Sequence, residues 1–303
     1  MMLPMASRPT DSDSLLSPQL LAQLERLELV SRKVFRGRLK GERRSRRKGQ
    51  SVEFADFRNY VPGDDLRFID WNLYARLEKL FLKIFMEEED LHFYALFDAS
   101  GSMEFGDPTK LYYAKQLAAA LGFVGLCRAD RVKVEALGAL RGSPAAALRG
   151  RHSLPRMLEY LETVEANQNV SLEQSIKDFC LRNTGKGILV LITDLMDKSG
   201  YETALRFLVS QQMDVYLIHL LSPEEMEPDV SGDLRLVDCE DDDVAEVTIS
   251  RPLLERYRRT LASFIQQARE FCTRRGIVYM LTTTDNPVEE LVSNYLRQRG
   301  LVR

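Results

Sequence analysis

Short apolar runs alternate along most of the chain with longer segments whose apolar positions recur at helical spacing. The runs with the length and continuous apolar character of buried strands are 91–98, 131–137, 187–194, 214–221 and 277–282. The segments with helical spacing are 108–126, 152–165, 171–183, 200–211, 251–275 and 287–299. This alternation predicts an α/β fold with a mainly parallel sheet and helices on both faces.

Two regions depart from the alternation. Residues 234–238 and 244–249 flank an acidic turn at 240–243, which predicts an inserted β-hairpin. Before residue 91, leucines at 20, 21, 24 and 27 predict an amphipathic helix from Pro18 to about Val34. We therefore expect a disordered segment at 1–17, a small N-terminal subdomain at 18–90 and the α/β domain at 91–303.

The composition is typical of a globular protein, with 303 residues, 45% hydrophobic and 29% charged. Apolar runs all fall well short of the ~20 residues that a membrane-spanning helix requires. The first 17 residues lack the basic start and apolar centre of a secretory signal. These features predict a cytoplasmic protein.

The formal net charge of -3 conceals a basic segment, because residues 31–50 contain ten Lys and Arg but one Glu. Its densest part, 36–48, could bind the phosphates of a nucleic acid. A basic surface that docks on an acidic partner explains the segment equally well, and nothing nearby resembles a recognition helix. Nucleic-acid binding is therefore kept as an alternative function.

The apolar run 91–98 ends in a group of oxygen-bearing side chains, Asp98, Ser100 and Ser102. Ligands of open α/β sheets bind at the carboxyl ends of strands, and Mg²⁺ prefers oxygen ligands and water. The run 187–194 also ends in an acid, Asp194, and parallel strands end at the same edge of a sheet. The pattern predicts a magnesium site, although Asp and Ser at these positions also serve as helix caps and turn formers.

An enzyme would need further groups that the chain does not supply in a recognisable pattern. His92 and His219 lie in predicted strands, where core packing is expected, and His152 lies at a predicted helix start. The sequence contains no glycine-rich phosphate loop of the Walker type. We therefore expect a non-enzymatic binding protein, with a metal-dependent hydrolase using Asp98 as an alternative.

The Asp98-x-Ser100-x-Ser102 pattern resembles the metal-ion-dependent adhesion site of von Willebrand factor A domains. The resemblance implies a Rossmann-like fold and a divalent ion, usually Mg²⁺, held by this loop, a second-loop Thr and a third-loop Asp. Asp194 matches the third loop. One coordination position would remain open for an acidic residue of a partner.

The second loop departs from the adhesion-site pattern. The expected threonine position falls on Val170, which has no oxygen in its side chain, and Ser171 follows it. Ser171 could bind the ion or could cap the helix predicted from residue 171. The departure implies a weaker ion site or a loop kept for its shape.

The segment 49–71 interleaves charged and aromatic residues. Arg58 and Arg67 can pair with nearby aspartates, which favours a structural role. The patterns Arg58-x-Tyr60-x-Pro62-Gly63-Asp64-Asp65 and Arg67-x-Ile69-Asp70-Trp71 closely resemble the domain of unknown function family 58. Members are typically associated with MoxR-type AAA+ ATPases. The resemblance implies an adaptor or chaperone-like protein that acts with such an ATPase on an unknown protein client.

Overall fold

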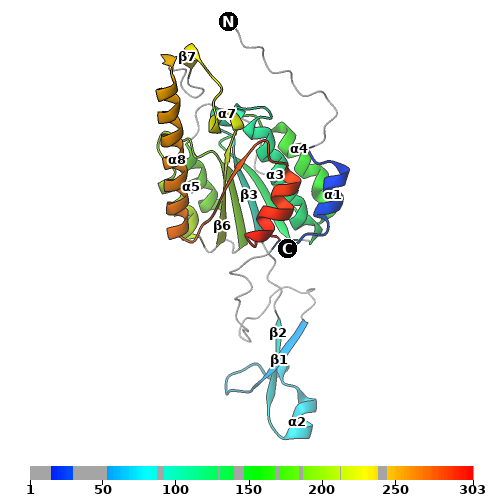
Figure 1. Ribbon diagram of the computed structural model, residues 1–303. Coiled ribbons are helices and arrows are strands. Elements are labelled where there is room, and N and C mark those ends of the chain that lie inside the picture. The colour runs from blue at the N-terminus through cyan, green and yellow to red at the C-terminus, as the bar shows by residue number, and fades with distance from the viewer. Residues whose placement is uncertain are drawn as a thin grey trace. The chain divides into compact units, whose positions relative to one another are not determined.

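The computed structural model describes residues 15–29, 53–86, 92–128, 130–139, 147–167, 171–183, 187–211, 213–237 and 244–302 (Figure 1). The chain divides into two compact units, one made of residues 1–32 and 91–303 and the other of residues 33–90. Among the described helices, none combines the length and the apolar character needed to cross a membrane.

A five-stranded parallel sheet forms the centre of the larger unit. Its strands are β3 (His92–Asp98), β4 (Arg131–Leu137), β5 (Gly187–Thr193), β6 (Met213–Leu221) and β9 (Val278–Thr283), in the order β4-β3-β5-β6-β9. All five strands predicted for this sheet are present, with each end within one residue of the predicted position. The α/β prediction with a parallel sheet is therefore confirmed.

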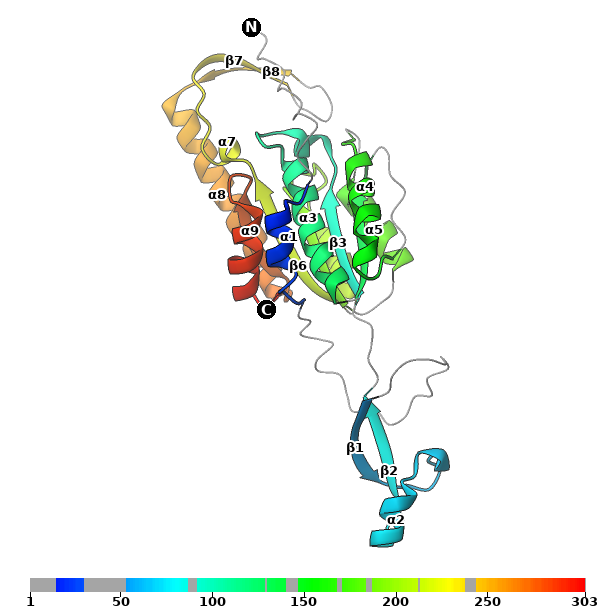
Figure 2. The ribbon, with the colours of Figure 1, turned by 90° about the vertical axis from the view of Figure 1, so that its right-hand side faces the viewer.

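Helices cover both faces of this sheet (Figure 2). Side chains of β3 alternate between the two sides, with Phe93 and Phe97 in one core and Tyr94 and Leu96 in the other. The first core also receives α1 (Pro18–Leu24), α3 (Lys110–Cys127), α4 (Leu154–Thr163) and the C-terminal helical segments α9 (Val288–Glu290) and the π-helix Leu291–Leu296. The second receives α5 (Leu172–Arg182), α6 (Glu202–Ser210) and α8 (Arg251–Arg274).

Helix α1 differs from its prediction in length and in place. It ends at Leu24 rather than near residue 34, and Leu20 and Leu24 are buried in the core that α3 also lines. Leu29 then forms an antiparallel bridge with Val302. The division of the structure places this helix in the larger unit, whereas the sequence grouped it with 18–90, because helical spacing does not reveal which core receives the apolar face.

The segment expected to be disordered, 1–17, lies mostly outside the described residues. Its described end is packed, since Leu15 and Leu16 are both buried in the same core as α1. The structure also contains the hairpin expected near residue 240, formed by β7 (Gly232–Val237) and β8 (Val244–Ile249). The acidic turn at 240–243 lies outside the described residues. The short helix α7 (Pro223–Met226) precedes this hairpin.

The smaller unit consists of an antiparallel pair, β1 (Glu53–Asn59) and β2 (Phe81–Met86), a 3₁₀ turn (Leu66–Phe68) and helix α2 (Trp71–Leu77). The Arg58 guanidinium donates two hydrogen bonds, of 2.8 and 2.7 Å, to the Asp64 carboxylate. Asp70 caps α2 and pairs with Lys83. These contacts agree with the structural ion pairing expected for this segment. The basic run 36–48 lies outside the described residues.

Candidate functional site

The two predicted acidic residues lie at the carboxyl ends of adjacent central strands. Asp98 ends β3, and Asp194 directly follows β5. The chain leaves β3 for β4 on one side of it and later returns to β5 on the other side, so the strand order reverses between β3 and β5. Ligands of open α/β sheets bind at such a reversal point. The topology thus brings both carboxylates to the edge where a binding site is expected.

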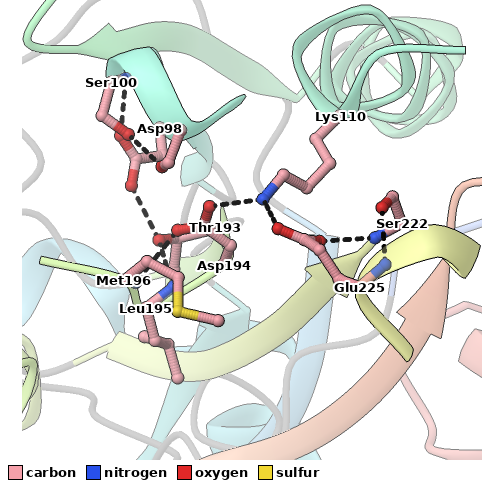
Figure 3. Close-up of polar contacts among 10 residues, drawn as sticks. Asp98, Ser100, Lys110, Thr193, Asp194, Leu195, Met196, Ser222 and Glu225 are labelled. Carbon is pink, nitrogen blue, oxygen red and sulfur yellow. Dashed lines mark hydrogen bonds and ion pairs between the residues drawn. The ribbon is translucent and has the colours of Figure 1, made fainter. Parts of the chain in front are cut away.

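The first loop arranges its oxygen atoms compactly (Figure 3). Oδ1 of Asp98 accepts a hydrogen bond of 2.9 Å from the Ser100 amide, which turns the chain back toward the carboxylate. The hydroxyl oxygens of Ser100 and Ser102 lie 3.1 Å apart. Neighbouring ligands of an octahedral Mg²⁺ ion are separated by about 3 Å, given Mg–O distances of about 2.0–2.1 Å. The two hydroxyls therefore have the spacing of a chelating pair.

Thr193, the last residue of β5, joins the two loops. Its hydroxyl donates a 2.8 Å hydrogen bond to Oδ2 of Asp98 and accepts one of 3.0 Å from the Leu195 amide. Leu195 has a φ of 60°, a left-handed conformation that is uncommon for a residue other than glycine. Such backbone strain persists where the surrounding structure imposes it and is concentrated at functional sites.

The environment of Asp98 disfavours its charge. Burial, reinforced by the nearby Asp194 carboxylate, raises the pKa of Asp98 to about 6, although hydrogen bonds from Thr193 and Ser100 oppose the shift. The side chain is buried at the strand end and receives neutral donors. A buried carboxylate of this kind is destabilising unless a cation joins it, and perturbed carboxylates of this type are concentrated at functional sites.

Lys110 is a member of the site that the sequence did not reveal. It is the first residue of α3 and is completely buried. Its Nζ donates hydrogen bonds of 2.7 Å to Oδ2 of Asp194 and 2.5 Å to Oε1 of Glu225 (Figure 3). Burial alone would lower the pKa of Lys110, but the two carboxylates outweigh it and raise that pKa above its ordinary value. The lysine is therefore charged.

Glu225 belongs to α7 and is held there by a capping box. Its Oε2 accepts a hydrogen bond of 2.7 Å from the Ser222 amide, while the Ser222 hydroxyl accepts one of 3.2 Å from the Glu225 amide. The first loop approaches this helix closely at Gly106, where an added Cβ would lie 2.9 Å from Cβ of Ser222. A glycine is required at that contact. Glu225 thus extends the acidic cluster from the strand ends to α7.

The donor set fits a magnesium-sized ion better than a softer metal. In the part of the chain that the structure describes, no three His, Cys, Asp or Glu side chains gather as metal ligands. The oxygens that gather are carboxylates and hydroxyls, with water expected to complete the shell, as Mg²⁺ tolerates. The carboxylates of Asp98, Asp194 and Glu225 and the ammonium of Lys110 have a formal charge of -2 together, which a divalent ion would neutralise.

Ser171 does not join this cluster through any contact in the structure. It is exposed and caps α5, with its Oγ accepting a 3.3 Å hydrogen bond from the Gln174 amide. Val170 lies outside the described residues. The second loop instead meets the first at Asn167, whose amide donates a 2.8 Å hydrogen bond to the Ala99 carbonyl. Of the two roles considered for Ser171, the structure favours the helix cap.

Replacing Ser171 by alanine should therefore destabilise the fold by about 1 kcal/mol, the usual effect of losing a helix cap. It should leave any response to Mg²⁺ unchanged. Urea denaturation with and without Mg²⁺ measures both quantities. A loss of the Mg²⁺ response in a folded Ser171→Ala protein would show instead that this hydroxyl serves the ion.

Two apolar side chains near the cluster are exposed to solvent. Met196, two residues after Asp194, is 38% exposed, and Phe105, at the end of the first loop, is 51% exposed. Aromatic residues and methionine are enriched at the centres of protein–protein interfaces relative to the rest of a protein surface.

A family model and several known proteins match this chain. The family model described as "Protein of unknown function DUF58" matches residues 56–269. Uncharacterized proteins of Mycobacterium bovis and Mycobacterium tuberculosis are each 30% identical to this chain over 257 residues, which cover 81% of this chain and 79% of the relative.

Two solved structures each match 69% of this chain. The conserved hypothetical protein BatB from Bacteroides thetaiotaomicron is 14% identical over 98% of its chain, with a TM-score of 0.41. An aerotolerance-related membrane protein from Bacteroides fragilis is 17% identical over 99% of its chain, with a TM-score of 0.43.

Proposed function

The chain belongs to the DUF58 family, and from this premise we propose that it is a non-enzymatic adaptor of the von Willebrand factor A type. It binds a partner protein through a divalent ion, Mg²⁺ in the first instance, at the carboxyl ends of β3 and β5. The observation that carries the proposal is the meeting of Asp98, the Ser100–Ser102 hydroxyl pair and Asp194 where the strand order reverses.

Within this proposal each residue has a distinct role. Asp98, Ser100 and Ser102 would hold the ion, and Asp194 would neutralise part of its charge. The ion, when bound, would supply an electropositive centre that attracts a carboxylate of the partner. Met196 and Phe105 would then contact apolar side chains beside that carboxylate, which accounts for their exposure.

The partner that fits the family resemblance is a MoxR-type AAA+ ATPase, with a protein client whose maturation or assembly the pair would assist. The chain has no Walker-type phosphate loop, so ATP hydrolysis would come from the partner. The basic run 36–48 would bind an acidic surface of the partner or client.

The test compares site variants rather than chelation, since an AAA+ ATPase itself needs Mg²⁺ with its nucleotide. Purified wild type, Asp98→Ala and Ser171→Ala are titrated against the MoxR-type ATPase of the same organism, and the dissociation constant is measured. We expect Asp98→Ala to weaken binding at least tenfold and Ser171→Ala to leave it unchanged. Wild-type affinity in a folded Asp98→Ala protein would refute metal-dependent docking, and circular dichroism provides the folding control.

A further inference from the structure

We propose that Lys110 is a resident cation of this site: it occupies Asp194 while no metal is bound and competes with a divalent ion for that carboxylate. This inference rests on the proposed function for the identity of the ion. Its starting point is the pair of hydrogen bonds that join Nζ of Lys110 to Asp194 and Glu225 (Figure 3).

The position of Lys110 indicates a role in the site rather than in its helix. Lys110 occupies the first turn of α3, where the helix dipole is positive and disfavours a cation. Its ammonium is also completely buried, which is unfavourable unless carboxylates compensate it. Within the described residues, the contacts with Asp194 and Glu225 offset both of these unfavourable effects, so the site explains why a lysine is present there.

Both oxygens of Asp194 are already engaged. Oδ1 accepts a 3.0 Å hydrogen bond from the Met196 amide, and Oδ2 accepts the 2.7 Å bond from Lys110. A divalent ion attracted to this carboxylate would meet the ammonium at the same oxygen and would be repelled by its charge. Lys110 therefore lowers the affinity of the site for a metal.

Glu225 provides the second partner that makes the competition reversible. Its carboxylate is fixed by the Ser222 cap, and the Tyr257 hydroxyl donates a 2.8 Å hydrogen bond to its backbone carbonyl. An ammonium displaced from Asp194 would keep its bond to Glu225 and would not become an unpaired buried charge. Lys110 thus binds two carboxylates, and it can give up Asp194 to the metal while it keeps Glu225.

Two substitutions and their combination distinguish occupancy of Asp194 from a simple effect of charge. Lys110→Met removes the competitor and makes the cluster more negative. Glu225→Gln makes it less negative and leaves Asp194 as the carboxylate partner of Lys110. The double variant keeps the charge of the wild type but frees Asp194. Lys115→Met is the matched control, because Lys115 lies in the same helix but donates to the Val164 carbonyl.

The measurement is the Mg²⁺ dissociation constant at pH 7.5, obtained by calorimetric titration of the full chain, with Asp98→Asn as the variant that lacks the ion site. We expect Lys110→Met to tighten Mg²⁺ binding about tenfold or more, which corresponds to about 1.4 kcal/mol. Glu225→Gln should weaken it, the double variant should bind more tightly than the wild type, and Lys115→Met should match the wild type.

The outcomes distinguish this inference from the proposed function. If the wild type binds Mg²⁺ and Asp98→Asn does not, but Lys110→Met binds no more tightly, the ion site stands and the competition is refuted. A double variant equal to the wild type also refutes occupancy. If neither the wild type nor Lys110→Met binds Mg²⁺, both proposals fail. Should Lys110→Met not fold, Glu225→Gln decides, because equal or tighter Mg²⁺ binding by that variant overturns the competition.

Discussion

Replacing Asp98 by asparagine is expected to stabilise the metal-free protein at pH 7.5 while abolishing any stabilisation by Mg²⁺. Burial raises the pKa of Asp98 to about 6 from an unfolded value of 3.8, so the fold disfavours the ionised form. The resulting destabilisation is fully present above pH 6 and is relieved as the pH falls toward 3.8. A shift of this size corresponds to about 3 kcal/mol at most, and we expect a gain of about 1–3 kcal/mol.

Asparagine can keep both neighbours of Asp98 as hydrogen-bond partners. Its carbonyl can accept from the Ser100 amide, and its amide group can donate to the Thr193 hydroxyl oxygen, which already accepts from the Leu195 amide. The Thr193 O–H then loses Asp98 as its acceptor, which takes part of the expected gain away. The free energy of unfolding is measured with urea at pH 7.5, in chelator and in Mg²⁺. A buried carboxylate that destabilises the metal-free protein is expected where its negative charge serves ligand binding rather than folding.

The control is Asp197→Asn in the same loop as Asp194. Asp197 accepts hydrogen bonds from the Leu172 and Ser199 amides, so its replacement should destabilise the fold and leave the Mg²⁺ response intact. A metal-free Asp98→Asn protein that is less stable than the wild type would contradict the prediction. So would a variant that is still stabilised by Mg²⁺.

The strand-end acids could be found from sequence because a parallel sheet brings its carboxyl ends to one edge. Apolar runs that stop abruptly at Asp98 and Asp194 contain that information locally. Lys110 and Glu225 could not be found in this way, since they are 115 residues apart and meet only where α7 folds beside α3. A lysine in the first turn of a helix, against the dipole, was the available signal.

The second loop and the N-terminal helix illustrate the same limit. The capping role of Ser171 can be predicted from sequence, because the cap is a local interaction with Gln174. The contact of Asn167 with Ala99 joins distant segments and left no periodic or compositional trace. Leu20 and Leu24 predicted an apolar helix face, but the core that receives this face depends on the tertiary fold.

His219 is a second buried group whose titration should change the free energy of unfolding with pH, in the direction opposite to that of Asp98. It is completely buried in β6, with Nδ1 2.7 Å from the Tyr279 hydroxyl. Burial lowers the pKa of His219 to about 4, and Lys110 adds to this, although Asp194 opposes it. Below pH 6.5 the imidazole is protonated in the unfolded chain but stays neutral in the folded protein. His219 therefore destabilises the fold progressively as the pH falls to about 4.

Between pH 7 and 4.5 the two groups nearly cancel in the wild type. Over this range Asp98 should increase the free energy of unfolding by about 2 kcal/mol, while His219 should decrease it by a similar amount. Metal-free Asp98→Asn should therefore lose about 2 kcal/mol more than the wild type on acidification. Adding His219→Phe should remove most of that loss, and the other carboxylates, common to all three proteins, cancel in the differences. Urea denaturation at the two pH values measures these differences in the free energy of unfolding. If acidification lowers this free energy equally in the wild type and in Asp98→Asn, then Asp98 is not a buried carboxylate whose charge destabilises the metal-free fold, and the cation site loses this support.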